Sequence, residues 1–504
     1  MARYKDYNYD QSKMLPVTFS EQILAGTFEY TVNYLVDNEM DLSIFEERYN
    51  NDDGGRPAYD PALLLKIILV AYSRGITSSR GIERLCRENV VFMALSADTQ
   101  PHFTTIADFI SRMHEVIEPL FIEVLMTCNS QGLIGGDMFA IDGCKMPSNA
   151  SKEWSGTRAD MTRKYRKIDR AVRRMLSRHR EEDDARQDND HTLRLREEQQ
   201  IKKLREASRK IKKFCTTVDD KRGISGRIVQ SNITDNDSAK MKTSRGVIQG
   251  YNGVAAVDNK HQIVIAAEAF GQGPENNLFA PITEAVKRNL GDKAVADSKI
   301  TADSGFHSQA TLQHCQDEHL DAYIADGNFR KRDPRFSTFE RFKPKERQRK
   351  YFKSEDFHYD QASDSCRCPA GNSLWKSYNR TIDGNAYVTF EGYLNECRAC
   401  PLQARCMRQP ANVRGRQVSI KLHGRAQAEL NLIDEMKLKI DSRQGRAIYA
   451  QRLGTVEPVF GNINTSKRLN RFSLRGKQKV NAQWLLYCMV HNVEKLQRYS
   501  SIAA

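Results

Sequence analysis

The sequence has few tryptophans, few prolines and no long apolar segment. Only 3 of its 504 residues are Trp and 14 are Pro. Its longest apolar run, residues 63–72, is interrupted by Lys66 and is shorter than the roughly 18–20 residues that span a bilayer. The N-terminal residues also lack the apolar core and small-residue cleavage site of a secretory signal. These absences exclude an integral membrane protein and predict a cytoplasmic location with no membrane partner.

Acidic residues are outnumbered by basic ones. The chain has 78 Lys and Arg against 64 Asp and Glu, a formal net charge of +14. Its apolar share of 39% and charged share of 28% are those of a globular chain rather than a disordered one. The length predicts two to four domains. The positive excess favours a polyanionic partner, most often nucleic acid.

Residues 1–130 are predicted to form an all-helical domain. Asp60 and Pro61 give the start of a helix that ends at Gly75. A second helix is expected over residues 80–88. A third is expected to begin near Thr105, whose spacing to Asp108 resembles a capping box. Short helices with basic turns fit either a helix-turn-helix reader of DNA or an ordinary helical bundle.

The middle of the chain contains two successive segments with different sequence patterns. Residues 161–213 hold 19 Lys and Arg against 10 Asp and Glu, which predicts a solvated helical hairpin or, alternatively, an arm that contacts phosphates. Residues 228–326 alternate strands and helices. With the apolar strand at 138–143, the order becomes β, β, β, α, β, α, β. This order predicts an α/β fold with one mixed sheet flanked by helices.

Three carboxylates stand where predicted strands or helices meet turns. Asp142 and Asp303 each follow an apolar strand, and Glu457 precedes Pro458. If they converge at one edge of the sheet, they could hold two Mg²⁺ or Mn²⁺ ions for phosphodiester chemistry. By spacing alone, the second acid could instead be one of three others at strand borders: Asp235, Asp237 and Asp258. A basic segment without acids follows Glu457 and could track DNA, with these members: Lys467, Arg468, Arg471, Arg475, Lys477 and Lys479.

Five of the eleven cysteines lie between residues 366 and 406. Cys397 and Cys400 form a Cys-x-x-Cys pair, and Cys406 follows. The fourth ligand of one tetrahedral Zn²⁺ could be Cys366 or Cys368, and we favour Cys368 because Pro-x-Gly follows it. Alternatively, the cysteines are reduced thiols packed in a small β insertion.

The stretch that precedes these cysteines is strongly basic. Residues 330–350 hold ten Lys and Arg against three acids. Aromatic residues interrupt the charges, and they are Phe336, Phe339 and Phe342. This pattern fits a segment that follows a DNA strand or a solvated linker.

Four ordered segments carry a family resemblance. They are FAIDGCKMPSNASKEWSGT (139–157), NITDNDSAKMKTSRGVIQGYNGVAAVD (232–258), ITADSGFHS (300–308) and YAQRLGTVEPVFGNI with RFSLRG (449–476). The sequence resembles the DDE-type insertion-sequence transposases of bacteria. The resemblance selects Asp303 as the second acid and implies an RNase H-like catalytic fold in which Asp142, Asp303 and Glu457 bind the metal ions.

The resemblance also implies DNA contacts around the last acid. Tyr449 and Arg452 match the family in type, whereas Asn464 stands where a Lys is expected seven residues after Glu457. Lys467 is the candidate to replace that Lys. The implied DNA-binding residues are Tyr449, Arg452, Lys467, Arg468, Arg471 and Arg475.

The predicted organisation follows from these segments. A helical domain that binds DNA ends covers 1–130, and the first part of the catalytic core covers 131–326, with a charged helical insertion at 158–225. A basic, Cys-rich insertion covers 327–440, and the last part of the core covers 441–504.

The implied activity is metal-dependent cleavage at insertion-sequence ends and strand transfer into target DNA. The alternatives are an RNase H-like nuclease or resolvase, and an inactive DNA-binding protein derived from a transposase. The resemblance also implies double-stranded DNA as partner, a homodimer in a synaptic complex, and association with the nucleoid.

Overall fold

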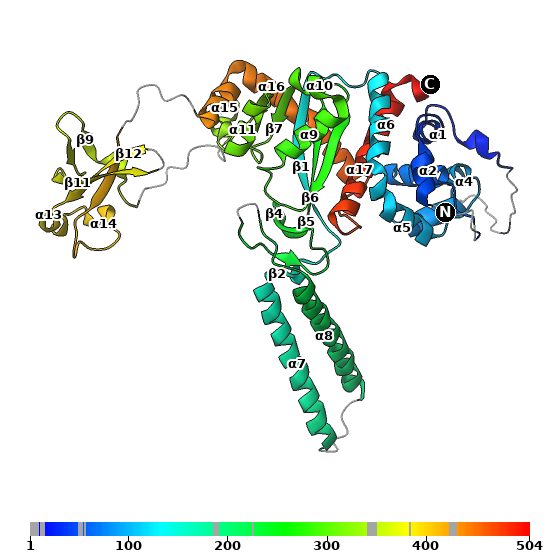
Figure 1. The fold of residues 1–504 in the computed structure, drawn as a ribbon, viewed down its shortest axis with the longest axis horizontal. Coiled ribbons are helices and arrows are strands. Elements are labelled where there is room, and N and C mark those ends of the chain that lie inside the picture. Colours follow the sequence, from blue (N-terminus) through cyan, green and yellow to red (C-terminus); the bar gives the residue numbers. More distant parts are fainter. Residues whose placement is uncertain are drawn as a thin grey trace, which may run out of the picture. The chain divides into compact units, whose positions relative to one another are not determined.

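The computed structural model describes residues 10, 16–48, 54, 57–184, 191–223, 226–339, 350–382, 385–422 and 431–503 (Figure 1). The chain divides into two compact units. Unit 1 comprises Met1–Gly327 and Met436–Ala504, and unit 2 comprises Asn328–Glu435. No helix in the described ranges is long and apolar enough to cross a membrane.

The described part of the N-terminal region is helical, as predicted. Its α-helices are α1 (Phe28–Asn38), α2 (Pro61–Ser73), α3 (Ser79–Glu88), α4 (Val90–Leu95), α5 (Phe103–Arg112) and α6 (Ile117–Ser130). Helix α2 begins as expected, because Asp60 Oδ1 accepts a hydrogen bond from Ala62 N at 2.8 Å. It ends before Gly75, whose φ of 71° suits glycine. The expected start near Thr105 was wrong: α5 begins at Phe103, and the ring of His102 caps it.

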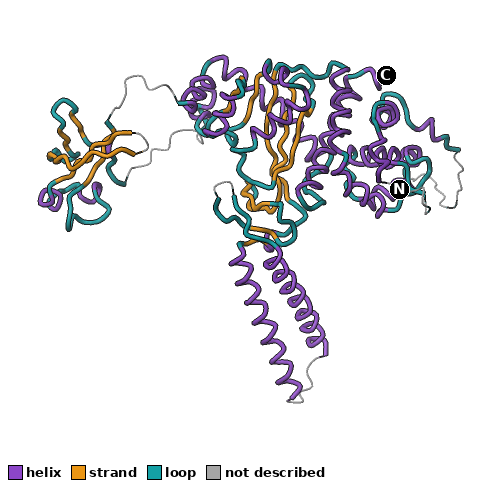
Figure 2. The backbone as a smooth tube through the Cα atoms, in the orientation of Figure 1, coloured by secondary structure: helices purple, strands orange, loops and turns teal. Residues whose placement is uncertain are grey.

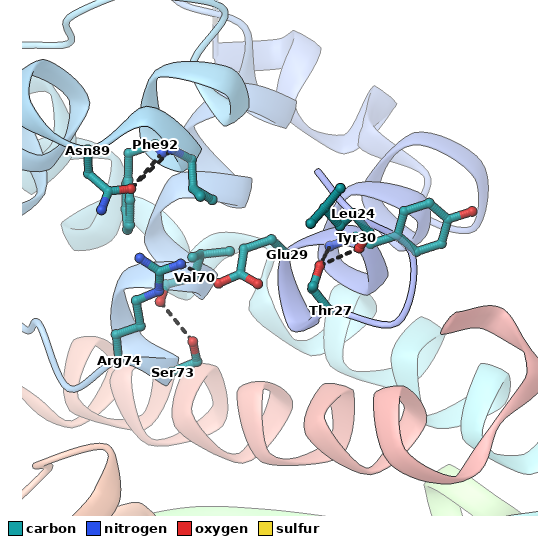
Figure 3. Close-up of polar contacts among 10 residues, drawn as sticks. Leu24, Thr27, Glu29, Tyr30, Val70, Ser73, Arg74, Asn89 and Phe92 are labelled. Atoms are coloured by element: carbon teal, nitrogen blue, oxygen red, sulfur yellow. Dashed lines mark hydrogen bonds and ion pairs between the residues drawn. The ribbon is translucent and has the colours of Figure 1, made fainter. Parts of the chain in front are cut away.

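Short polar contacts fix the ends of these helices (Figure 3). Thr27 accepts a hydrogen bond from Tyr30 N at the start of α1, and Asn89 accepts from Phe92 N at the start of α4. Glu29 of α1 pairs with Arg74, just after α2, at 2.5 Å. The two capping contacts satisfy backbone N–H groups that the first turn of a helix leaves without partners, and the ion pair links α1 to the end of α2.

A mixed sheet forms the centre of unit 1 (Figure 2). Its strands are β1 (Met138–Pro147), β4 (Ala239–Thr243), β5 (Gly246–Asp258), β6 (Val264–Phe270), β7 (Lys299–Ala302) and β8 (Asp321–Ile324). The order is β4-β5-β1-β7-β8, with β6 also paired to β5. Strands β5 and β6 are antiparallel to their neighbours, whereas β7 and β8 continue parallel to β1. The predicted mixed sheet with alternating helices is therefore confirmed.

Helices pack against this sheet. They are α9 (Phe279–Leu290), α10 (Asp292–Ala296), α11 (Gln309–Asp317), α15 (Leu432–Asp441), α16 (Arg443–Gly461) and α17 (Lys477–Tyr499). Helix α17 lies between the sheet and the N-terminal helices. Asn492 of α17 hydrogen bonds with both N and O of Val264, and Asn481 accepts from Ala269 N, so the free edge of β6 is covered. On the other side of α17, Tyr487 stacks on Tyr72 of α2 at 4.6 Å between ring centroids.

The charged segment is a helical hairpin, a form that suits both a solvated hairpin and an arm that contacts phosphates. It consists of α7 (Arg158–Asp184) and α8 (His191–Thr217), and a short pair of strands, β2 (Ser155–Gly156) and β3 (Ser231–Asn232), lies at its base. Few apolar side chains are buried along it, and they are Met161, Val172, Ile201 and Ile211. His179 Nε2 contacts Glu197 Oε2 at 2.7 Å across the two helices.

Unit 2 is built on a five-stranded sheet of order β13-β12-β11-β10-β9. The strands are β9 (His358–Asp360), β10 (Ser365–Arg367), β11 (Ser373–Ile382), β12 (Asn385–Gly392) and β13 (Gln417–Lys421), and the helices are α12 (Phe329–Arg332), α13 (Leu394–Arg398) and α14 (Gln403–Cys406). Its core is small and consists of Phe357, Cys366, Leu374, Val388, Phe390 and Val418. Of the predicted basic stretch 330–350, residues 340–349, with Phe342, lie outside the described residues.

Candidate active site

The strand register brings the two predicted aspartates together. Strands β1 and β7 pair in parallel, and their last paired residues are Ile141 and Ala302. Asp142 and Asp303 are the next residues on the two strands, so both lie where these strands separate. The expectation that the first strand ends at Asp142 was wrong: β1 continues to Pro147 because β5 remains paired with it on the other side.

Asp142 is a partly buried carboxylate with both oxygens occupied. Its Oδ2 accepts a hydrogen bond from Arg452 Nη1 at 2.7 Å, and its Oδ1 accepts from Gly143 N at 2.8 Å. Burial raises the pKa of Asp142 to about 6, the Arg452 guanidinium opposes the rise, and nearby Asp303 adds to it. The fold therefore holds two acids close together and pairs Asp142 directly with Arg452.

Glu275 is a third carboxylate at this edge, and sequence reasoning missed it. A Cβ atom placed on Gly305 would lie 2.1 Å from Glu275 Oε2 and 3.0 Å from Asp303 Oδ1, so both carboxylates flank this glycine. Glu275 Oε1 accepts from Asn252 Nδ2 at 3.0 Å and lies 3.1 Å from Lys145 Nζ. The strand order could have indicated Glu275. Strand β6 runs parallel to β1, so the loop after β6 lies at the same edge of the sheet as Asp142.

Glu457 lies on α16, which packs against β1, β7 and β8. Its side chain is exposed, and in the described residues it makes no hydrogen bond or ion pair. Two helical turns later, Asn464 Nδ2 donates to Cys144 Sγ at 3.1 Å, two residues from Asp142 on β1. Thus α16 lies over the aspartates, but within the described ranges no group of three or more His, Cys, Asp or Glu is arranged to hold a metal ion.

Buried polar atoms without partners surround the aspartates. Among the described residues, Asn252 Oδ1, Asn464 Oδ1 and Arg452 Nε are buried and have no hydrogen-bond partner. Asn252 Oδ1 lies beside Gly143, 2.8 Å from where a Cβ on that glycine would be. Native proteins seldom leave such atoms unsatisfied without a functional reason. Two of the three are acceptor oxygens, which suit a hydrated cation.

The predicted DNA-binding residues divide into buried and exposed groups. Arg452 is 6% exposed, pairs with Asp142 and lies over the ring of Tyr449. Lys467 is 0% exposed, and its Nζ pairs with Glu494 Oε2 at 2.6 Å. This burial argues against its predicted role as a DNA contact, because a phosphate cannot reach the buried ammonium group.

The exposed arginines keep donors available. Arg471 Nε donates to Ser148 O and Arg475 Nε donates to Asn149 O, which positions both side chains beside the loop after β1. Arg468 is exposed as well.

The alternative aspartates have structural partners. Asp258 accepts hydrogen bonds from the backbone of Gly135, Gly136 and Lys260 at the β5–β6 turn. Asp235 accepts from Tyr251 Oη, and Asp237 accepts from Lys477 N at the start of α17. These contacts explain their positions at strand borders without a catalytic role.

The predicted zinc ligands lie together in unit 2. Cys368, Cys397, Cys400 and Cys406 line one enclosed cavity, whereas Cys366 packs in the core of the unit.

Comparison with known families gives two matches. A model described as "Transposase DDE domain" matches residues 367–497, which include the cavity cysteines and Glu457. A model described as "Transposase domain (DUF772)" matches residues 17–112, the region of α1 to α5. No curated protein was found to match the chain. The two family matches, at opposite ends of the sequence, identify the chain as an insertion-sequence transposase of the DDE type.

Proposed function

We propose that this transposase cleaves DNA at the ends of its element and joins the freed 3′-hydroxyl to target DNA. The observation that carries the proposal is the adjacency of Asp142 and Asp303 on parallel strands β1 and β7. Two partly buried carboxylates at the point where parallel strands separate form an acidic site, and such strand ends are where open α/β sheets bind their ligands.

We further propose that the core of unit 1 is RNase H-like. Supporting this, the sheet path β6-β5-β1-β7-β8 has two antiparallel pairings, β6–β5 and β5–β1, on one side of β1 and two parallel pairings, β1–β7 and β7–β8, on the other. In chain order, Asp142 then lies in the first strand of this path and Asp303 directly follows the fourth, and α16 packs against both strands.

The side chains present fit Mg²⁺ or Mn²⁺, two ions in the proposed site. Asp142, Asp303 and Glu457 would hold them, since hard cations prefer carboxylate oxygens and the unpartnered amide oxygens can bind retained waters. Such ions, when bound, activate the attacking oxygen and stabilise the leaving oxygen of a phosphodiester. Arg452 holds Asp142 in place by their ion pair and keeps it ionised above its pKa of about 6.

Glu457 and Glu275 are rival third carboxylates. Glu457 is proposed from the family resemblance, and Glu275 is favoured by its contact with the loop that bears Asp303. Glu457→Gln and Glu275→Gln separate them, since neither change alters side-chain size. We expect Glu457→Gln to abolish cleavage, while Glu275→Gln weakens it by about 10–100-fold, as loss of a residue outside the ligand set does. The reverse order of effects would assign the third ligand to Glu275.

DNA binding is proposed along the basic surfaces of unit 1. A pocket of about 580 Å³ is lined by Trp154, Lys210, Lys213, Phe214 and Arg475, among others. Lysines that hold phosphates beside aromatic rings that stack on bases are typical of nucleic-acid grooves. We propose that the N-terminal helices bind the element ends, and that two copies of the chain join the ends in a synaptic complex.

The test is a strand-transfer assay with labelled element ends, target DNA and Mg²⁺ or Mn²⁺. We expect cleaved ends and joined products, and neither with Asp142→Asn, which should still bind the ends. Cleavage without joined product would support the nuclease or resolvase alternative. End binding without cleavage in either metal would support the inactive DNA-binding alternative.

A further inference from the structure

Unit 2 contains an enclosed cavity whose wall is rich in sulfur. Its volume is about 30 Å³, the space of about one small ion or water molecule, and four cysteines line it: Cys368, Cys397, Cys400 and Cys406. All four are free cysteines, as is each of the others in the chain. A small ion or a water molecule fits a cavity of this size.

The local backbone brings the four cysteines to the cavity from three turns. Cys368 follows β10 and begins a tight turn, in which Gly371 N donates to Cys368 O at 2.8 Å. Gly371 has a φ of 89°, which glycine adopts without strain. Cys397 lies in α13, Cys400 follows that helix, and Cys406 ends α14. A set of ligands on short turns is typical of structural zinc sites.

The surroundings of Cys397 fit a thiolate. Arg416 N points at its Sγ at 3.5 Å, a donor that stabilises negative charge on sulfur. Two glycines lie against the same atom: a Cβ on Gly392 or Gly415 would be 2.8 or 3.3 Å from Sγ. Any larger residue at Gly392 would crowd the sulfur. The backbone therefore leaves space for this sulfur and directs an N–H group at it.

Cys366 shows what a purely packed cysteine looks like in the same unit. It is 1% exposed and surrounded by apolar core residues such as Leu374 and Phe390. The four cavity cysteines are only partly buried and share the cavity wall with Glu396, Gln403 and Arg416. The structure thus separates Cys366 from the set and places Cys368 in it.

The small hydrophobic core of unit 2 is a reason to expect a stabilising ion in the cavity. Six buried residues form the hydrophobic core cluster of a unit of about 100 residues. Domains with so little apolar burial usually need a disulfide, a metal or a partner to remain folded. The cysteines are free, so no disulfide stabilises the described part of unit 2.

We propose that Cys368, Cys397, Cys400 and Cys406 bind one structural Zn²⁺ that stabilises unit 2. The thiols surround the cavity without forming a preassembled ligand set, so binding requires side-chain rotation toward the cavity centre. Each thiol that becomes a ligand releases its proton to solvent, which makes binding weaker at low pH. The proposal does not depend on the catalytic assignment, because all four ligands lie in unit 2.

The first test is the metal content of the purified full-length chain, measured by mass spectrometry after dialysis. We expect about one Zn²⁺ per chain in the wild type and in the matched control Cys366→Ser. Cys397→Ser and Cys400→Ser should retain less than about a tenth of it. Zinc in the two cavity variants equal to that in the control would overturn the assignment, as would a wild-type chain that takes up no zinc on incubation with it.

A second measurement tests the zinc proposal even if a serine variant fails to fold. Titration of the zinc-depleted wild-type chain with Co²⁺ should produce the visible absorption of a tetrahedral thiolate site, which one equivalent of Zn²⁺ then abolishes. Asp142→Asn should give the same spectrum, since it alters only the carboxylate site. No thiolate absorption from a folded chain would show that the cysteines are packed thiols.

Discussion

Asp142 and Asp303 of unit 1 lie where two paired strands separate, whereas the cavity thiols of unit 2 lie on a tight turn and in or beside two short helices. In unit 1, the β1–β7 register places Asp142 and Asp303 side by side, and a large core holds both strands. In unit 2, a tight turn and two short helices surround a cavity above a small core. Under our proposal, the fold of unit 1 positions its aspartates through strand pairing, while the fold of unit 2 relies on a bound Zn²⁺ to hold its thiols together.

The largest expected effect is on catalysis. Asp303→Asn should reduce cleavage by more than about 100-fold, the upper range for losing a residue outside the ligand set, because a proposed metal ligand itself is lost. Melting temperature should change little, since Gly305 N can still donate to the amide oxygen. Cleavage rate and thermal unfolding of the same preparation provide the check. A variant that cleaves normally would remove Asp303 from the site.

Zinc removal should lower the folding stability of unit 2 and leave that of unit 1 unchanged. A zinc chelator should unfold unit 2, because structural zinc supplies about 10–16 kcal/mol of apparent binding free energy in small domains. Hydrogen exchange should then show loss of protection in β11 and β12, with unchanged protection in β1 and β5. Equal loss in both units, or in neither, would contradict the distinction between them.

The Arg452–Asp142 ion pair should contribute to the folding stability of unit 1. The two side chains are 7% and 19% exposed, so removing the cation leaves a charge with little solvent. Arg452→Met should lower the free energy of unfolding by about 3–5 kcal/mol at pH 7.5. Its double mutant with Asp142→Asn should recover much of that loss. Denaturant unfolding of the four proteins in this cycle measures the coupling.

The smallest effect is a pH dependence that belongs to unit 1. The pKa of Asp142 is raised from 3.8 to about 6 on folding, so the folded state favours its protonated form. Its contribution to stability is therefore complete below about pH 4 and is lost as the pH rises through 6. At 1.36 kcal/mol per unit, the stability of the wild type relative to Asp142→Asn should fall by about 3 kcal/mol between pH 4 and 7.5. A constant difference over this range would mean that Asp142 is not buried as described.

Local chemistry made much of the fold predictable. The Asp60–Pro61 helix start, the mixed sheet and the charged hairpin follow from caps, apolar patterns and charge. The start of α5 at Phe103 was not predicted, because the ring of His102 caps this helix. Histidine is a less usual N-cap residue than the threonine that was expected.

The parts of the candidate site that escaped prediction depend on distant partners. The continuation of β1 past Asp142 requires β5, more than 100 residues away. Glu275 joins the site only because β6 turns its end to the same edge. The burial of Lys467 depends on Glu494 of α17, which spacing near Glu457 cannot reveal.

The position of α17 has a consequence for the order in which the protein is made. The helix comprises residues 477–499 of 504, yet it covers the β6 edge and stacks on α2, which lies near the start of the chain. The N-terminal helices and the sheet are therefore synthesised before the helix that joins them. A chain that stops before α17 lacks this closure and leaves the β6 edge and Tyr72 of α2 without the contacts that α17 provides.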